Sequence, residues 1–218
     1  MTEYAADLVD ETLQRRARTL RADIESGALR GGELLAVLRD VPFVDRDAWT
    51  DEVLGFAAPP PDVQLPRGSV PYLPCGVDEI MAMVEAVPLR PTDEVVDLGS
   101  GLGRVVVLAH LLAGMKACGI EIQEHLVASA RATAAALGLS AVSFVHANAA
   151  DAVLDGSVFF LFAPFNGEML ANVVRRLEDL AQERSFVVCT VGIELDAPWL
   201  RRRVASHRTL VIYDTITR

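Results

Sequence analysis

Basic residues are in the minority in this chain of 218 residues, which holds 20 Lys and Arg against 30 Asp and Glu and has a formal net charge of −10 at pH 7. Such a surface repels a phosphate backbone unless a local basic patch exists, which argues against nucleic acid as a partner. Two dense basic runs are present, at residues 15–18 and 201–203. Both are typical of solvated helix faces, so neither predicts a nucleic-acid site.

Cysteine is also scarce, since Cys75, Cys118 and Cys189 lie far apart and no two of them form a CxxC pair. This spacing excludes a disulfide framework and a zinc site. No cluster of His and Asp has metal-ligand spacing, and Asn148 and Asp151 alone are too few to indicate a divalent ion, so we expect no metal. Free thiols are typical of a reducing cytoplasm.

Long apolar runs are missing as well. No stretch reaches the length of about 18 apolar residues at which a membrane span is expected. Residues 1–7 are acidic and lack the basic and then apolar pattern of a secretion signal. Together these features predict a cytoplasmic protein that does not enter a membrane.

Half of the residues are hydrophobic (51%), which is enough to bury a sizeable core. The N-terminal part favours helices at 4–26, 33–39 and 45–56, with Asp45 as the cap of the third. A proline-rich stretch at 57–68 then predicts a stiff linker. We therefore predict a helical N-terminal extension or cap at 1–68 and a main domain at 69–218. The extension would cover the site or form the surface of a homodimer.

Strand and helix patterns alternate through the main domain, after a short helix at 77–84. The predicted strands are 94–98, 116–121, 142–146, 157–163, 185–191 and 209–217, and the predicted helices are 103–113, 124–138 and 167–182. This alternation predicts an α/β fold with a doubly wound, mostly parallel sheet. The last strand has no helix after it, so we expect it to insert antiparallel near the edge of the sheet.

The strongest chemical signal is the turn that follows the first of these strands. Asp97 precedes three glycines at alternate positions, Gly99, Gly101 and Gly103, and an apolar helical pattern follows at once. A strand, a glycine turn and a helix N-terminus in this order form the element that binds a nucleotide-like cofactor.

Two details of the turn favour S-adenosylmethionine (SAM) over NAD. A dinucleotide fingerprint needs its third glycine where this chain has Arg104. The acid at Asp97 would oppose a pyrophosphate held at the turn but suits a ligand that carries an ammonium group. SAM has that group, a sulfonium and no phosphate.

Polar residues at two further strand ends extend the predicted pocket. Glu121 ends the second strand about 20 residues after Gly101, the separation at which a carboxylate reaches ribose hydroxyls. Asn148 follows the third strand, where a polar side chain can hydrogen-bond an adenine edge. The backbone N–H that follows, at Ala149, can serve a ring nitrogen. Because NAD-binding and SAM-binding proteins both use such an acid, Glu121 indicates a nucleoside without separating them.

Together these motifs make residues 70–191 resemble the class I, seven-strand, Rossmann-like SAM-dependent methyltransferases. The resemblance implies a seven-strand sheet with an antiparallel C-terminal strand and SAM as the cofactor. Asn148 stands where such enzymes usually carry Asp. The cofactor-binding residues that the resemblance implies are Tyr72, Asp97, Gly99, Ser100, Gly101, Gly103, Glu121, Ile122, Asn148, Ala149 and Ala163.

Narrower likenesses flank the glycine turn. Residues 70–75 resemble the segment before this turn in bacterial methyltransferases and in seven-strand protein-lysine methyltransferases, which implies Tyr72 and Pro74 as lid residues. Residues 160–166 resemble a fourth-strand Asn-Pro-Phe motif of bacterial relatives, which implies Pro164, Phe165 and Asn166 as substrate contacts. Enzymes that methylate amines carry Asn where this chain has Ala163, and this departure argues against transfer to nitrogen.

No catalytic residue is assigned, because no strong base stands near the predicted strand ends. Methyl transfer from a sulfonium releases a neutral group and needs a base only when the acceptor is protonated. The acceptor is left open between a protein side chain and a small metabolite. Two other functions also stay open: a SAM-binding sensor or scaffold, and a pyridine-nucleotide oxidoreductase, against which Arg104 argues.

Overall fold

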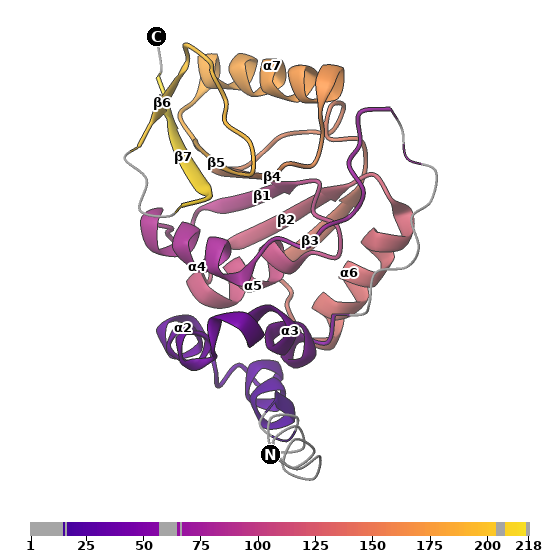
Figure 1. Cartoon of the computed structure of the whole chain (residues 1–218), viewed down its shortest axis with the longest axis vertical. Coiled ribbons are helices and arrows are strands. Elements are labelled where there is room, and N and C mark those ends of the chain that lie inside the picture. The colour runs from indigo at the N-terminus through magenta and orange to yellow at the C-terminus, as the bar shows by residue number, and fades with distance from the viewer. Residues whose placement is uncertain (1–14, 16, 57–64, 66, 204–207, 217–218) are drawn as a thin grey trace.

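The computed structural model describes residues 15, 17–56, 65, 67–203 and 208–216. Within these ranges seven strands form one sheet in the order β3-β2-β1-β4-β5-β7-β6 (Figure 1). Strands β1 to β5 run parallel, β7 is antiparallel to β5, and β6 is antiparallel to β7. The predicted α/β fold is thereby confirmed. The strands are β1 (Glu94–Leu98), β2 (Lys116–Glu121), β3 (Val142–His146), β4 (Val158–Phe162), β5 (Val187–Val191), β6 (Leu200–Arg202) and β7 (Leu210–Thr215).

Helices cover both faces of the sheet. Helix α7 covers one face, whereas α4, α5 and α6 cover the other, with α2 and α3 packed outside them (Figure 1). None of the helices in the described ranges is long and apolar enough to cross a membrane. The helices are α2 (Gly31–Asp40), α3 (Phe43–Leu54), α4 (Val77–Ala86), α5 (Arg104–Ala113), α6 (Glu124–Ala136) and α7 (Gly167–Glu183).

Neighbouring residues of a central strand pack into different hydrophobic cores, because side chains alternate between the two faces of a sheet. On β1, Val95 belongs to the core that includes α5, and Val96 to the core that includes α7. Phe160 and Phe159 divide in the same way on β4. The strand order reverses between β1 and β4, and α/β sheets bind ligands at the carboxyl ends of the strands at such a point.

Strand β6 is not predicted from the sequence, and the expectation that the basic run at 201–203 lies on a helix face is wrong, because Arg201 and Arg202 belong to this strand. It is only three residues long, and two of them are exposed arginines, so it lacks the apolar alternation of a strand. It pairs with β7 and takes the edge of the sheet. The predicted C-terminal strand therefore lies one strand in from the edge.

The N-terminal helices differ from prediction at their ends. Helix α2 begins at Gly31, and α3 begins at Phe43 with Pro42 at its N-cap, so Asp45 lies in the first turn and is not the cap. Gly55, in the left-handed conformation, ends α3 before the predicted limit. Of the predicted helix at 4–26, residues 15 and 17–25 are helical, and the rest lies outside the described residues, as does most of the linker at 57–68.

The helical extension is joined to the main domain through the first residue of α5. The guanidinium of Arg104 is buried, with the side chain 5% exposed. It donates to both carboxylate oxygens of Asp51 on α3 and, over 2.7 Å, to the carbonyl of Cys75. Asp47, one turn earlier on α3, accepts from the N–H of Val77 at the start of α4 (2.8 Å). Two acids of α3 thus hold the starts of α4 and α5. Whether the extension also serves as a cap or dimer surface stays a prediction.

Replacing Arg104 with Met should lower the free energy of unfolding by about 2–3 kcal/mol, because it leaves Asp51 and the Cys75 carbonyl without their partner. Urea denaturation followed by circular dichroism measures the change. Arg39→Met is the matched control, since Arg39 pairs with Glu85 where both side chains are exposed. That variant should lose less than about 1 kcal/mol. Equal losses in the two variants would contradict the role assigned to Arg104.

Candidate functional site

The glycine turn is closed by contacts that leave no room for side chains. Gly99 and Gly101 have φ values of 88° and 54°, in the region that favours glycine. A Cβ at Gly99 would lie 2.3 Å from the Cβ of Pro164, and one at Gly101 would lie 2.2 Å from the ring of Tyr72. The turn is therefore packed against the segment before α4 and the loop after β4, the two segments that the sequence links to it.

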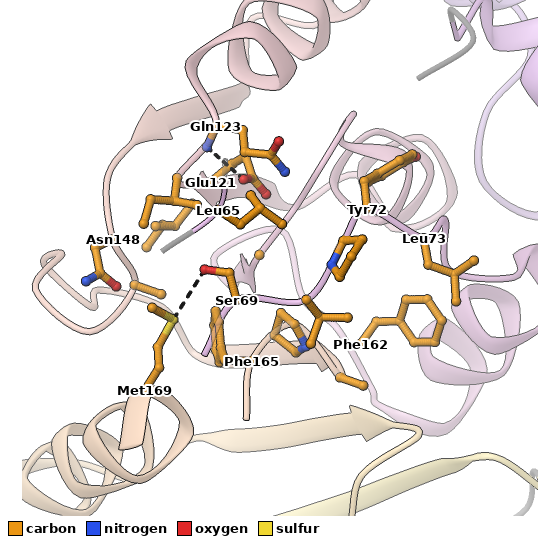
Figure 2. Close-up of a pocket in the computed structure, with 18 of the residues that line it drawn as sticks. Leu65, Ser69, Tyr72, Leu73, Glu121, Gln123, Asn148, Phe162, Phe165 and Met169 are labelled. Carbon is orange, nitrogen blue, oxygen red and sulfur yellow. Dashed lines mark hydrogen bonds between the residues drawn. The ribbon is translucent and has the colours of Figure 1, made fainter. Parts of the chain in front are cut away.

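A cavity of about 300 Å³ opens at the carboxyl ends of β1, β2 and β4 (Figure 2). Glu121, Gln123 and Asn148 lie along one part of its wall, and Tyr72, Leu73 and Phe162 along another (Figure 2). The cavity brings together many of the predicted site residues from five separate segments. Those that line it are Tyr72, Gly99, Glu121, Ile122, Asn148, Ala149, Ala163, Pro164 and Phe165.

The other predicted residues lie beside this cavity or behind it. Asp97 and Ser100 line a small neighbouring cavity that shares Tyr72 and Gly99 with the large one. Gly103 lines neither, and a Cβ there would meet the ring of Phe144 at 2.4 Å. Gly103 thus allows α5 to pack closely on β3, which is a packing role. Asn166 is exposed at the N-cap of α7, and its N–H donates to the carbonyl of Gly68 (2.9 Å). Their roles in binding stay predictions.

Glu121 connects the glycine turn to the end of β2. Its carboxylate is buried and accepts from the N–H of Gly101 (2.9 Å) and from the N–H of Gln123 (2.8 Å; Figure 2). Each carboxylate oxygen has further acceptor capacity. The side chain is therefore held rigidly at the cavity wall and can still accept hydrogen bonds from a ligand's hydroxyl groups.

Asp97 is a buried acid without a hydrogen-bond partner among the described residues. Burial, with a smaller contribution from the charge of Glu121, raises the pKa of its carboxyl to about 8. Ser100 lines the same small cavity, and its hydroxyl, which is buried against Gly119 of β2, also has no partner within the described part of the chain. Unpaired buried polar groups are costly, so this corner suits a ligand that brings positive charge and hydrogen-bond donors.

The loop after β3 presents a backbone donor to the cavity. The side-chain oxygen of Asn148 accepts from the N–H of Ala150 (3.0 Å), which closes the turn. The N–H of Ala149 has no hydrogen-bond partner among the described residues, although Ala149 is buried and lines the cavity. The amide nitrogen and the second lone pair of the oxygen let Asn148 donate to a ligand or accept from it.

Residues 69–76, here called the strap, cross the cavity and are held at both ends. Ser69 forms an antiparallel bridge with Phe165, and the N–H of Val70 donates to the carbonyl of Pro164 (3.2 Å). At the other end, Arg104 binds the carbonyl of Cys75. Burial raises the pKa of the Tyr72 phenol to about 12, so this side chain stays protonated at neutral pH. Tyr72 lines both cavities and Pro74 the small one, and their function as lid residues stays a prediction.

Ala163 is the one non-glycine residue with positive φ (38°) among the described residues. It follows β4, lines the cavity and lies 3.6 Å from where a Cβ of Gly192 would be. Strained backbone of this kind persists where the surrounding structure enforces it, often at functional sites. The sequence identifies Ala163 only by the Asn that it lacks, so this strain adds a feature that the motif does not contain.

Several cavity residues are not predicted from the sequence. Gly192 follows β5 directly. Its position at the carboxyl end of a strand would identify it as a cavity residue once the order of the strands is known. Met169 lies on the first turn of α7 and accepts a weak hydrogen bond from the Ser69 hydroxyl (Figure 2). Leu65, Leu73 and Gln123 carry no motif that singles them out. Within the described residues, no group of three His, Cys, Asp or Glu is placed to hold a metal.

Known proteins share parts of this arrangement. A family model described as histone methylation protein DOT1 matches residues 74–159. A protein-L-isoaspartate O-methyltransferase of Methylorubrum extorquens (strain PA1) is 33% identical over 138 residues, which are 61% of this chain. The chain spans only 55% of that relative's length.

One solved structure shares the fold over most of its own length. It is the crystal structure of an RNA methyltransferase from Salinibacter ruber in complex with S-adenosyl-L-homocysteine, with 26% sequence identity and a TM-score of 0.53. The likeness covers 66% of this chain and 94% of that one. With the strand order of the sheet and the glycine turn at the end of β1, it shows that this chain has the fold of the class I SAM-dependent methyltransferases.

Proposed function

We propose that this chain is a SAM-dependent methyltransferase whose acceptor is an amino group on a basic substrate. The observation that carries the proposal is the wall of the cavity. It joins a rigid carboxylate at Glu121 and an unpaired N–H at Ala149, and the small cavity beside it holds the unpaired buried acid Asp97. The ligand groups that match the acid, the carboxylate and the N–H are an ammonium, ribose hydroxyls and an adenine ring nitrogen.

The polar groups at the two cavities complement the charge and the hydrogen-bonding groups of the cofactor. Asp97 and Ser100 would hold the methionine end, and Glu121 the ribose. Asn148 and Ala149 would hold the adenine, with the apolar side chain of Ile122 against the ring. A dinucleotide fits less well, because the turn that would receive its pyrophosphate lies beside two acids.

The cofactor, when bound, supplies an electrophilic methyl group on a sulfonium, and the leaving thioether is neutral. The protein therefore needs no general acid, and its contribution is positioning and exclusion of water. Apolar side chains can do this on the part of the cavity near the strap, where Leu73, Phe162 and Phe165 lie (Figure 2).

The acceptor is inferred from what lines that part of the cavity. No His, Asp, Glu or Lys among the described residues stands there to take a proton. An acceptor must then lose its proton to solvent before transfer, as an ammonium group can, or carry none, as a carboxylate does. The net charge of −10 repels carboxylates and phosphates and attracts cationic substrates, which favours the amine even though Ala163 stands in place of the Asn of amine-methylating enzymes. The family model named for histone methylation supports a basic protein as the substrate.

A transfer assay tests the proposal. Methyl-labelled SAM should label a lysine-rich protein, and acetylation of the lysines should abolish the labelling because an amide nitrogen is not a nucleophile. Glu121→Gln should lower the rate about tenfold or more, since it places an amide N–H₂ or a weaker acceptor against the N–H of Gly101. Glu124→Gln, an exposed position on α6, is the matched control and should leave the rate unchanged.

Two outcomes of this assay would contradict the proposal. Binding of SAM without release of the demethylated product on any acceptor would indicate a sensor or scaffold. Transfer to RNA, or to the acetylated protein equally well, would show that the acceptor is not an amine.

Stability at different pH values tests the part assigned to Asp97. Its pKa in the folded protein is about 8, above the ordinary value of 3.8, so the folded state favours the protonated form. The associated stability is present below the ordinary pKa and is lost as the pH rises through about 8. Asp97→Asn should therefore raise the melting temperature of the free protein more at pH 8.5 than at pH 5.

A ligand with an ammonium group should reverse this loss for the natural residue. The rise in melting temperature on adding S-adenosylhomocysteine should increase with pH in the unmodified protein and stay nearly constant in Asp97→Asn. The same ligand-induced rise at both pH values in the unmodified protein would contradict the pairing.

A further inference from the structure

The loop that carries Asn148 and Ala149 is held from outside the cavity by helix α7. Arg176 on this helix donates from Nη1 to the carbonyl of Ala149 (3.1 Å) and from Nη2 to the carbonyl of Ala152. The side chain is half-buried, and both of its hydrogen bonds are at least partly shielded from water. One guanidinium therefore bridges two backbone carbonyls of the same loop.

The rest of the loop is closed by its own backbone. Ala147 donates to the carbonyl of Glu121 (3.0 Å), and Asp151 and Ala152 both donate to the carbonyl of Asn148. These bonds satisfy the groups that face the sheet and the turn. The carbonyls of Ala149 and Ala152 face α7 instead, and Arg176 is the partner that they have there.

We propose that Arg176 is a positioning residue for adenine recognition, acting through the backbone of Ala149 and Ala152. By holding these two carbonyls toward α7, it keeps the opposite side of the loop turned to the cavity. Asn148 and Ala149 line the cavity on that side. The inference rests on the proposed function, in which this loop receives the adenine of the cofactor.

A planar guanidinium suits this role better than an ammonium. Its donors form a fixed fork, so that one side chain can bind two acceptors at once, whereas a lysine offers a single charged centre. Helix α7 can supply the fork rigidly because Val173 and Leu177, on either side of Arg176, are fully buried under the sheet. The loop is thus held by a rigid side chain that does not itself line the cavity.

The neighbouring arginine provides a matched control. Arg175 is exposed, and its hydrogen bond is with Asn172 on the same helix. Arg175→Met and Arg176→Met make the same chemical change at neighbouring positions of α7. Only the second change releases the two loop carbonyls.

The test compares two ligands by isothermal titration calorimetry: S-adenosylhomocysteine and S-inosylhomocysteine, in which hypoxanthine replaces adenine. Ring nitrogen N1 accepts a hydrogen bond in adenine but carries a proton in hypoxanthine, so the N–H of Ala149 should favour the adenosyl ligand. Arg176→Met should reduce this preference about tenfold, because the donor is no longer held in place. Arg176→Lys should reduce it by less, and Arg175→Met should leave it unchanged.

The preference between ligands separates positioning from a general structural role. If Arg176 only stabilised the fold, both ligands would lose affinity together, and the melting temperature would fall without a change in their ratio. That result, or an unchanged ratio in both Arg176 variants, overturns the proposal. Should Arg176→Met fail to fold, Arg176→Lys alone decides by the same ratio. Failure of the unmodified protein to bind S-adenosylhomocysteine would instead overturn the proposed function.

Discussion

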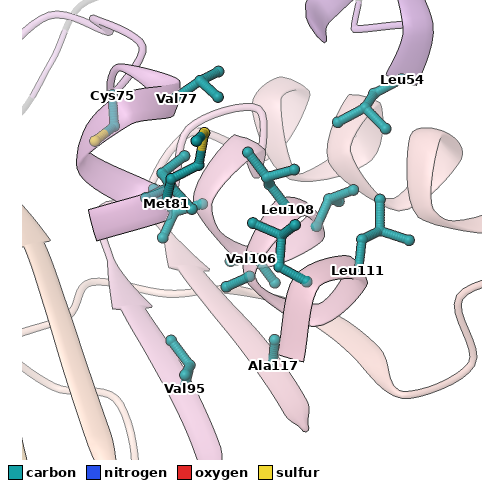
Figure 3. Close-up of a cluster of buried hydrophobic side chains, with 14 of the residues drawn as sticks. Leu54, Cys75, Val77, Met81, Val95, Val106, Leu108, Leu111 and Ala117 are labelled. Atoms are coloured by element: carbon teal, nitrogen blue, oxygen red, sulfur yellow. The ribbon is translucent and has the colours of Figure 1, made fainter. Parts of the chain in front are cut away.

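The buried guanidinium of Arg104 is the interaction on which the arrangement of the site depends. Arg104 follows the last glycine of the turn and is the first residue of α5, and its guanidinium binds both α3 and the strap. The apolar core continues across the same junction, where Leu54 of α3 lies in one cluster with Val77 and Met81 of α4 and Leu108 of α5 (Figure 3). A buried cation needs its partners, so the turn, the strap and the helical extension can be in place only together.

This constraint accounts for the electrostatics of the cavity. The guanidinium of Arg104 binds Asp51 and the carbonyl of Cys75 and forms no hydrogen bond or ion pair with Asp97, although both residues line the small cavity. Asp97 therefore stays unpaired, whereas Glu121 is satisfied by backbone N–H groups and keeps its place. An unpaired acid beside a rigid hydrogen-bond acceptor favours a ligand that joins an amino acid to a nucleoside over a dinucleotide. This combination arises because Arg104 pairs with Asp51 and leaves Asp97 without a cation.

The sequence predicts the main domain well because its signals are local. Alternating strands and helices, the glycine turn and the acid at the end of β2 each show within a few residues, and they locate most of the cavity wall. Strand β6 escapes because two of its three residues are arginines. Contacts between residues far apart in the sequence are missed for another reason. Nothing near Arg104 indicates that it will bind Asp51, and nothing near Arg176 indicates that it will bind the carbonyl of Ala149. The positive φ of Ala163 and the hydrogen bond from the N–H of Ala150 to the side chain of Asn148 are not visible in the sequence either, since each depends on how a loop closes.

In the proposed binding mode, the ends of β1, β2 and β3 each contact a different part of S-adenosylmethionine. A crystal structure of the protein with S-adenosylhomocysteine is the decisive measurement. We expect the ammonium at the Asp97 carboxylate, both ribose hydroxyls at Glu121, and adenine N1 at the N–H of Ala149. A ligand bound elsewhere, or bound in this cavity with Asp97 and Glu121 both out of contact, would contradict it.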